Sequence, residues 1–321
     1  MTRDTLEHNQ IPVYFAAVLL AAVFGLLAPS LAHGLSVWVT PAIAVLMYAM
    51  FLQIPFLDVR QGLSNRRFLS ALLLANFILV PLLVWILTLG LVERPALLVG
   101  ALLVLLTPCI DYVVVFTHIG KGDSRLMLAA TPLLLLLQLA LLPVYLGFML
   151  GAQSEVVVEP GPFVEAFLLL IVVPMVLAVI TTSLAQRSSV VGVWNSAWAW
   201  LPVPAMALVL FVVIASQITS VVRDISLLLP VIPVYVGFLL LAPLTGVLAS
   251  RLFALPAVTA RAVTFSASTR NSLVVLPLAL ALPEDVRGLA AAAVILQTLV
   301  ELMGELLYIR LIPRWVWPAG G

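Results

Sequence analysis

Four ionisable side chains lie well inside long apolar stretches of this sequence, namely Asp111, Arg270, Glu301 and Glu305. Charged residues are rare and costly inside a lipid bilayer, so each is a candidate for binding a substrate or an ion. Asp111 and Arg270 occupy corresponding places in the two halves of the chain, and they meet if their helices cross. Such an ion pair either has only the structural role of joining the two halves, or lies beside a substrate site and is separated or protonated during transport.

Three polar residues follow one another at i, i+4 and i+8, which places Gln297, Glu301 and Glu305 on one helix face. A protonatable carboxylate on such a stripe suits proton coupling, while the alternative is hydrogen bonding between helices by protonated glutamates. Glu165 and Arg261 lie nearer to the ends of apolar stretches, so we expect their long side chains to reach the membrane interface.

Cys109 is the one cysteine of the chain and directly follows Pro108. A lone buried cysteine commonly packs as a small hydrophobe, but a thiol in a polar site inside the membrane is also a soft ligand for metals and metalloids. The three histidines are scattered, so no metal site is expected. The sequence has no Walker loop, catalytic triad or zinc motif. We therefore expect no enzyme activity and no cofactor, and transport driven by an ion gradient or by the substrate's own gradient.

The elements that position these residues follow from composition. Of the 321 residues, 64% are hydrophobic and 9% are charged, whereas soluble domains carry about 25% charged residues. A net charge of +1 gives no reason to expect nucleic acid as a partner. The composition predicts an all-α integral membrane protein.

A spanning helix needs about 20 mostly apolar residues. The sequence contains ten such stretches: 11–29, 36–57, 68–91, 95–119, 125–151, 162–184, 200–219, 227–249, 256–282 and 287–311. The connections between them are short, and the longest polar one, about 185–199, is an ordinary loop in length. We therefore expect one transmembrane domain over 1–321, with no separate soluble domain.

Basic residues predict the orientation, because they gather on the cytoplasmic side of a membrane. If ends and loops alternate between the two sides, ten basic residues fall on one side and three on the other. The ten are Arg3, Arg60, Arg66, Arg67, Lys121, Arg125, Arg187, Arg251, Arg310 and Arg314, and the three are Arg94, Arg223 and Arg287. We expect a multi-pass protein of the cell membrane with both termini in the cytoplasm.

Ten helices divide into two groups of five, over about 11–151 and 162–311. An odd number of spans in each group inverts one relative to the other, which is a common build for secondary transporters. The fourth helix of each group has small and polar residues in its middle, at 107–115 and 268–275. Such interruptions predict unwound helices, which are tolerated where they lie inside protein or line a cavity.

One motif resembles a known family. Thr107-Pro-Cys109, followed after eleven residues by Lys121-Gly-Asp123, is similar to the helix-4 signature of bacterial and fungal arsenite permeases, which read Ala-Pro-Cys and Lys-Gly-Asp at the same distance. Those permeases belong to the bile acid/sodium symporter superfamily. The resemblance implies ten helices in a panel domain and a core domain, with the fourth and ninth helices unwound and crossing.

The same resemblance implies site residues. It assigns Cys109 to a cysteine required for transport, and it matches Leu299-Val-Glu301 to a run in the last helix of the permeases. Efflux in those proteins is driven by proton exchange. Asn271 matches an asparagine of the symporters' Glu-Thr-Gly-x-Gln-Asn motif in the ninth helix.

The chain also departs from both branches. The permeases carry an acidic residue where Ser272 stands and a small residue at the place of Asp111. The sodium-binding Glu and Gln of the symporters become Ser266 and Arg270, and a Ser-Asn pair in the fourth helix becomes Val113-Val114. These replacements indicate that the sodium sites are lost.

We therefore expect a secondary transporter that exports arsenite or antimonite in exchange for protons. Cys109, Asp111, Arg270 and Asn271 would bind substrate, and Glu301, Asp111 and Glu305 would carry protons. The alternative is a proton-coupled or uniport carrier of small organic anions, with Arg270 as the carboxylate partner. The expected partners are a small inorganic or organic solute, protons and membrane lipid. A sensor or scaffold role is disfavoured, because the sequence shows no soluble output domain.

Overall fold

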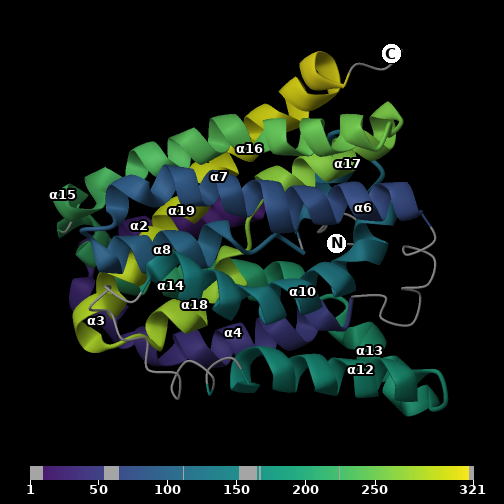
Figure 1. The fold of residues 1–321 in the computed structure, drawn as a ribbon. Coiled ribbons are helices and arrows are strands. Elements are labelled where there is room, and N and C mark those ends of the chain that lie inside the picture. The colour runs from purple at the N-terminus through teal and green to yellow at the C-terminus, as the bar shows by residue number, and fades with distance from the viewer. Residues whose placement is uncertain are drawn as a thin grey trace. The chain divides into compact units, whose positions relative to one another are not determined.

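The computed structural model describes residues 10–53, 65–110, 112–151, 165, 168–223 and 225–317. Every named regular element in these residues is a helix (Figure 1). The chain divides into two compact units. Unit 1 comprises Met1–Gln53 and Glu159–Ser226, and unit 2 comprises Ile54–Val158 and Leu227–Gly321.

The helices of unit 1 are α2 (Gln10–Leu27), α3 (Pro29–Gly34), α4 (Ser36–Phe51), η3 (Leu168–Val172), α12 (Val173–Ala185), α13 (Ser189–Trp198) and α14 (Pro202–Arg223). Helices α2 and α14 approach closely at Gly25, where an added Cβ would lie 2.6 Å from the Ala215 carbonyl oxygen. The hydroxyl of Thr219 donates to the Gly25 carbonyl at 3.2 Å. The short helix α13 lies where the sequence predicted a polar loop.

The helices of unit 2 are α6 (Arg66–Leu74), η1 (Ala75–Leu79), α7 (Val80–Thr88), η2 (Leu89–Leu91), α8 (Pro95–Leu105), α9 (Tyr112–Ile119), α10 (Ser124–Leu150), η4 (Leu229–Val231), α16 (Ile232–Leu252), α17 (Ala257–Ser268), α18 (Ser272–Leu280), α19 (Glu284–Leu311) and η5 (Ile312–Val316). The short helix α15 (Ile225–Leu228) joins the segments of the two units.

Glycine allows two close helix contacts in unit 2. A Cβ at Gly100 of α8 would lie 2.6 Å from the Ala290 oxygen of α19, and one at Gly246 of α16 would lie 2.6 Å from Thr264 Cα of α17.

The ten predicted apolar stretches each contain a helix in the described residues. Five helical segments are long and apolar enough to cross a membrane: Arg66–Leu91, Ser124–Leu150, Pro202–Thr219, Ile225–Leu252 and Asp285–Arg314. The interruptions predicted in the fourth and ninth stretches are present, since α8 ends before α9 begins and α17 ends before α18 begins. The number of spans and the inverted repeat remain predictions.

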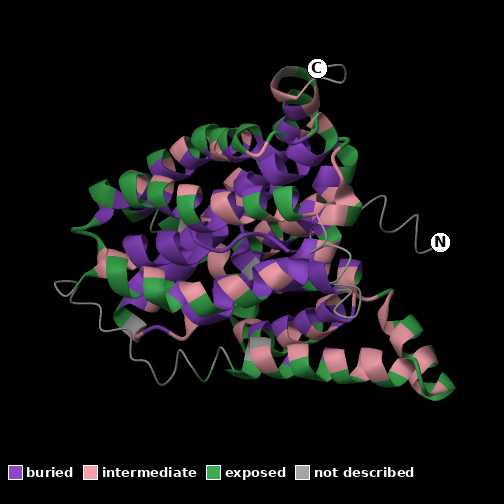
Figure 2. Ribbon diagram, turned by 45° about the vertical axis from the view of Figure 1, so that its right-hand side comes forward, coloured by how far each residue is buried: buried purple, intermediate pink, exposed green. Residues whose placement is uncertain are grey.

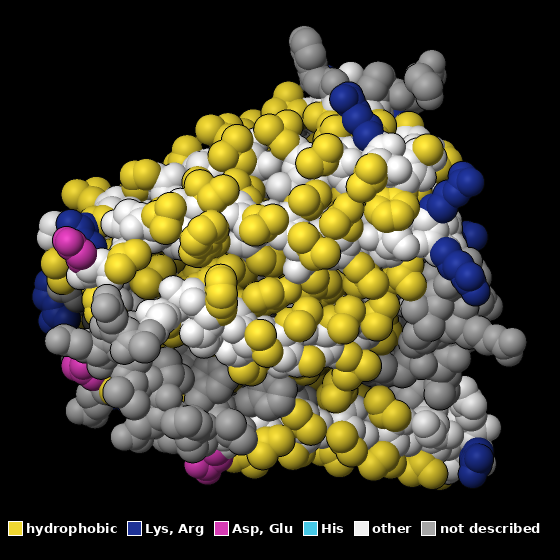
Figure 3. All heavy atoms as spheres, in the orientation of Figure 1, with side chains coloured by type: hydrophobic (Ala, Val, Ile, Leu, Met, Phe, Trp, Pro, Cys, Tyr) yellow, Lys and Arg dark blue, Asp and Glu magenta, His cyan; other side chains and the backbone are white. Residues whose placement is uncertain are grey.

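The surface of unit 2 suits a lipid environment. Buried residues lie on the inward sides of its helices and exposed ones on the outward sides (Figure 2). Large hydrophobic side chains cover the outer face over α7 and α16 (Figure 3). The most exposed of these on the two helices are Leu82, Trp85, Ile86, Leu240, Leu244, Leu248 and Leu252.

Candidate functional site

The two interrupted helices of unit 2 are joined through their breaks. The Asn271 N–H donates to the Thr107 oxygen at 2.8 Å, and the Cys109 N–H donates to the Thr269 oxygen at 3.1 Å. Pro108 and Arg270 are paired between these two bonds as an antiparallel bridge. Buried backbone groups need hydrogen-bond partners inside a membrane protein, and here each break supplies partners for the other.

The local sequence explains where the helices stop and restart. Pro108 has no N–H and disfavours helical geometry at Thr107. The Thr107 hydroxyl bonds back to the Leu103 oxygen at 3.0 Å, near the end of α8. At the other break, the Asn271 side chain accepts from the Val274 N–H at 3.2 Å and caps the start of α18.

Arg270 is fully buried at this junction, with 0% of its surface exposed. Its Nη2 donates to Asn76 Oδ1 at 2.9 Å and to the Ser266 oxygen at 2.6 Å, and its Nη1 lies 3.5 Å from the Leu105 oxygen. The guanidinium carbon lies 5.5 Å from the centre of the Phe238 ring, within the range of a cation–π contact. All its hydrogen-bond acceptors among the described residues are therefore neutral.

The two backbone acceptors are carbonyls at the ends of half-helices. The Ser266 oxygen would ordinarily accept from the Arg270 N–H, but that group bonds to Glu301 instead. The Leu105 oxygen would ordinarily accept from the Cys109 N–H, which is used in the pairing of the breaks. Each helix C-terminus carries the equivalent of about −0.5 elementary charge, so the two ends together come to about −1. One guanidinium balances them.

The predicted polar stripe of α19 faces this junction. Glu301 Oε1 accepts from the Tyr112 hydroxyl at 2.8 Å, and both carboxyl oxygens lie 3.0 Å from the Arg270 backbone nitrogen. Gln297 Nε2 donates to Glu301 Oε2. One turn further along, Glu305 Oε1 lies 2.8 Å from the Thr269 hydroxyl. The stripe thus contacts the breaks directly instead of facing lipid.

Cys109 lies inside the break with 0% of its surface exposed. Pro108, the residue before Cys109, is bridged to Arg270, and the Cys109 N–H bonds to the Thr269 oxygen, so the structure brings Cys109 and Arg270 close together in the paired breaks. Asp111 lies outside the described residues, and its pairing with Arg270 therefore remains a prediction. The side chains of Val113 and Ser266 are buried, and Ser266 Oγ accepts from Asn76 at 3.0 Å.

Two residues at the junction are not among the site residues predicted from the sequence. Asn76 accepts from the Arg270 guanidinium. It lies in η1, a π-helical turn between α6 and α7, and such turns are frequent at functional sites. Tyr112 was not singled out, although it directly follows the predicted break. Its hydroxyl lies within hydrogen-bond distance of both Glu301 and the Arg270 oxygen, at 2.8 and 2.9 Å.

The expectation for Arg261 was wrong. Its side chain is buried, and it donates to the Lys121 oxygen at 2.9 Å and to the Trp317 oxygen. The arginine does not reach toward lipid headgroups, because backbone carbonyls near one end of unit 2 satisfy it. Glu165 is exposed, as expected.

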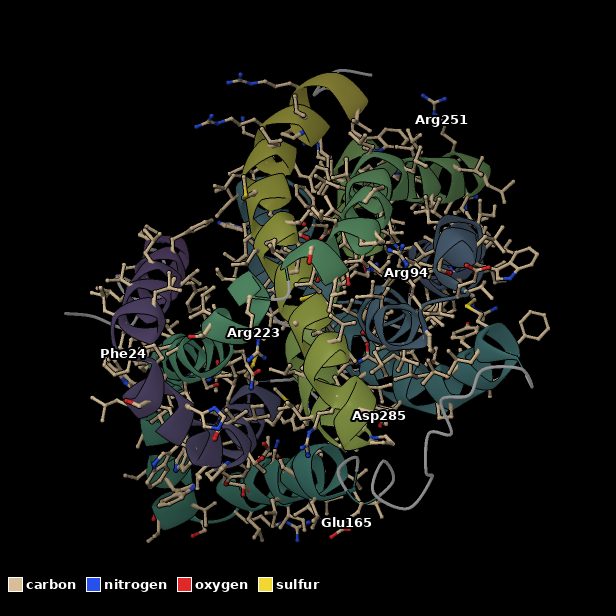
Figure 4. The ribbon with its side chains drawn as sticks, turned by 90° about the vertical axis from the view of Figure 1, so that its left-hand side faces the viewer. Phe24, Arg94, Glu165, Arg223, Arg251 and Asp285 are labelled. Carbon is tan, nitrogen blue, oxygen red and sulfur yellow. The ribbon has the colours of Figure 1, made fainter. Side chains whose placement is uncertain are left out.

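Charges at the ends of helices contrast with the buried cluster. Figure 4 looks along the helices of unit 2 and labels Arg94, Arg251 and Asp285, which are exposed residues near helix ends. Among the described residues of this unit, the buried Glu301 and Glu305 of α19 and Arg270 at the break form the charged part of the candidate site.

Comparisons with known proteins agree with a transporter. A family model described as the Sodium Bile acid symporter family matches residues 40–224, which is more than half of the chain. The matched region includes the break around Cys109. No curated protein matches the sequence.

Proposed function

The chain belongs to the sodium bile acid symporter family, and on this premise we propose that it exports arsenite or antimonite in exchange for protons. Members of the family are transporters and not enzymes, and the apolar helices agree with a multi-pass membrane protein. The observation that carries the proposal is the position of Cys109, fully buried at the paired breaks and beside Arg270.

The thiol supports a soft substrate. Trivalent arsenic and antimony are soft centres that bind sulfur, and soft ligands select for such centres. The chain has one cysteine, so each molecule offers the metalloid a single thiol ligand. A carrier must release what it binds, and one thiolate contact holds the substrate less tightly than several would.

The coupling ion proposed here is the proton and not sodium, although the family name mentions sodium. In many transporters of this build, carbonyls of unwound helices and C-terminal ends of half-helices coordinate the coupling ion. In this chain the Arg270 guanidinium bonds to such carbonyls at Ser266 and Leu105. A fixed cation at this place repels a second one. Glu301 and Glu305, together with Asp111, are the proposed proton carriers.

A specific observation supports a second candidate, the transport of small organic anions. The Arg270 guanidinium bonds only to neutral acceptors among the described residues. At the start of α18, the buried atoms Asn271 Nδ2 and Ser272 Oγ have no hydrogen-bond partner in that same part of the chain. Half-helix N-termini point at anionic groups of substrates in several transporters, and a carboxylate could accept from both atoms.

We also propose that the protein has ten spans in two inverted groups of five, and that it lies in the cell membrane with both termini in the cytoplasm. Unit 1 takes the first two predicted spans of each group, and unit 2 takes the last three of each. The interrupted helix is the fourth in both groups. This correspondence is what two repeats would produce, and it adds to the ten-to-three distribution of basic residues. Reporter fusions that place either terminus outside would contradict the orientation.

Arsenite accumulation in a metalloid-sensitive bacterium tests the substrate. Cells that express the protein should accumulate less arsenite and survive higher concentrations than cells with an empty vector. Cys109→Ser should abolish this resistance while the protein remains in the membrane and elutes as a folded species. Thr298→Val is the matched control, because among the described residues its hydroxyl bonds only to its own helix at Val294. Full resistance of Cys109→Ser would refute the metalloid mechanism.

Transport in proteoliposomes tests the coupling ion and separates the two candidates. At fixed pH, replacing sodium by choline should leave arsenite transport unchanged, while a pH gradient should drive it. Stimulation by a sodium gradient would contradict the role given to Arg270. Uptake of small carboxylates without any arsenite transport would favour the second candidate.

A further inference from the structure

The hydroxyl of Thr269 lies between two acceptors. Its Oγ1 is 2.6 Å from the Phe265 oxygen in the last turn of α17 and 2.8 Å from Glu305 Oε1 on α19. A threonine hydroxyl has one hydrogen and can also accept. If Glu305 were ionised, both neighbours would be acceptors and they would compete for one hydrogen.

A proton on Glu305 removes this competition. The carboxylic acid then donates to Thr269 Oγ1, and the threonine donates to the Phe265 oxygen, so that every hydrogen has one acceptor. The remaining oxygen, Glu305 Oε2, has no hydrogen-bond partner among the described residues, and the side chain is 0% exposed. An ionised carboxylate with so few donors is very costly to bury, and such groups neutralise instead.

Glu301 differs from Glu305 in its donors. The Tyr112 hydroxyl is shared between Glu301 Oε1 and the Arg270 oxygen, but Glu301 has two nitrogen donors as well. Both its oxygens lie 3.0 Å from the Arg270 backbone nitrogen, and Gln297 Nε2 donates to one of them. These nitrogen groups can only donate, so they favour the ionised form of Glu301. Two carboxyl groups one turn apart on α19 therefore have different environments, and one buried guanidinium stands beside them.

We propose that Glu305 is the proton-binding site of the transporter and is protonated in this conformation, while Glu301 is ionised. Thr269 is the positioning residue that couples the proton to the fold. When Glu305 loses its proton, the Thr269 hydroxyl turns from the Phe265 oxygen to the carboxylate and so alters the last turn of α17 beside the break. This assignment rests on the proposed proton coupling and names the group that performs it.

The groups around Glu305 decide when its proton can leave. Glu301 precedes it by one turn and Tyr308 follows by three residues, both on α19. The break contributes Arg270 and Cys109, and α9 contributes Tyr112, whose hydroxyl contacts Glu301. Like charges at i and i+4 on a helix repel, so an ionised Glu305 opposes an ionised Glu301. Asp111, outside the described residues, is a further acidic group near the break in sequence.

Infrared spectroscopy of the protein in lipid, at neutral pH and without substrate, tests the assignment. A protonated carboxylic acid has a carbonyl stretching band that a carboxylate lacks. The wild-type protein should show such a band, Glu305→Gln should lose it, and Glu301→Gln should retain it. Because no substrate is present, a wrong assignment of Glu305 can be told apart from a wrong choice of arsenite.

A second variant keeps the test decisive if Glu305→Gln does not fold. Thr269→Val keeps the shape of the side chain but removes the acceptor, so the acid band should shift to higher wavenumber. Thr298 also lies on α19, and in the described part of the chain its hydroxyl bonds only to Val294, so Thr298→Val should leave the band unchanged. The proposal is overturned if the wild type has no acid band, if Glu301→Gln removes it in place of Glu305→Gln, or if Thr269→Val behaves like Thr298→Val.

Discussion

Replacing Arg270 by alanine tests how much its buried guanidinium stabilises the junction of the two interrupted helices. The side chain makes two short hydrogen bonds, 2.9 Å to Asn76 Oδ1 and 2.6 Å to the Ser266 oxygen. Hydrogen bonds to charged groups contribute about 1.5–3 kcal/mol each, so the two together contribute about 3–6 kcal/mol. The 3.5 Å approach to the Leu105 oxygen is too long to add much.

An opposing effect reduces this loss. Burying a guanidinium costs several kcal/mol of desolvation, and alanine removes that cost. The same change leaves the buried Asn76 Oδ1 and Ser266 oxygen without the guanidinium donor. A buried polar group that loses its hydrogen-bond partner costs about 1–3 kcal/mol. We therefore expect Arg270→Ala to lower the free energy of unfolding by about 2–6 kcal/mol.

Reversible unfolding in mixed micelles measures this difference. Arg251→Ala is the matched control, because Arg251 is exposed at the end of α16 (Figure 4), and exposed substitutions usually change stability by less than about 0.5 kcal/mol. Asn76→Leu removes one acceptor of the guanidinium. Combined with Arg270→Ala in a double-mutant cycle, it should show a coupling of about 1.5–3 kcal/mol. Additive effects, or a loss for Arg270→Ala no larger than for Arg251→Ala, would refute the reasoning.

Three further predictions concern other parts of unit 2. Gly100→Ala should lower the free energy of unfolding by about 1–3 kcal/mol, because the added Cβ would press on the backbone of α19. Gly90→Ala is the control and should not lower it, because an added Cβ there meets no other part of the described structure within 4 Å. Equal losses for the two variants would contradict the close packing at Gly100. Arg261→Ala should make the C-terminal segment that it holds more sensitive to carboxypeptidase, and an unchanged digestion rate would show that the bond does not hold it. If Asp111 and Arg270 are partners, each single alanine variant should unfold more easily than the double variant, whereas additive losses would exclude the pair.

The sequence by itself determined the class of the protein and the places where two helices stop. A soluble fold cannot bury the apolar surface of a chain with so many hydrophobic and so few charged residues. The apolar stretches of spanning length each contain a helix in the structure. Pro108 and the polar residues 268–272 interrupt helical geometry locally, so the breaks follow from short-range chemistry. The stripe of Gln297, Glu301 and Glu305 was equally visible, because helix periodicity alone places them on one face.

The partners of these residues were decided by the tertiary structure. The sequence offers Asp111 as a partner for Arg270 because the two occupy corresponding places in the halves, but a long arginine side chain reaches acceptors in several directions. In the structure its guanidinium bonds to Asn76, 194 positions away, and to carbonyls whose usual donors are engaged elsewhere. No local pattern shows that these donors are lost, since the loss depends on how the two breaks pair.

The difference between Glu301 and Glu305 has the same origin. Both are glutamates on one face of one helix, and the sequence treats them alike as candidate proton carriers. Gln297, on the same helix, donates to Glu301, but only the packing of α19 against the breaks adds the Arg270 N–H and the Tyr112 hydroxyl, whereas Glu305 has a single hydroxyl as its neighbour among the described residues. Short-range periodicity places a side chain on a face, whereas the donors that surround it come from segments far away in the chain, and these decide whether it holds a charge.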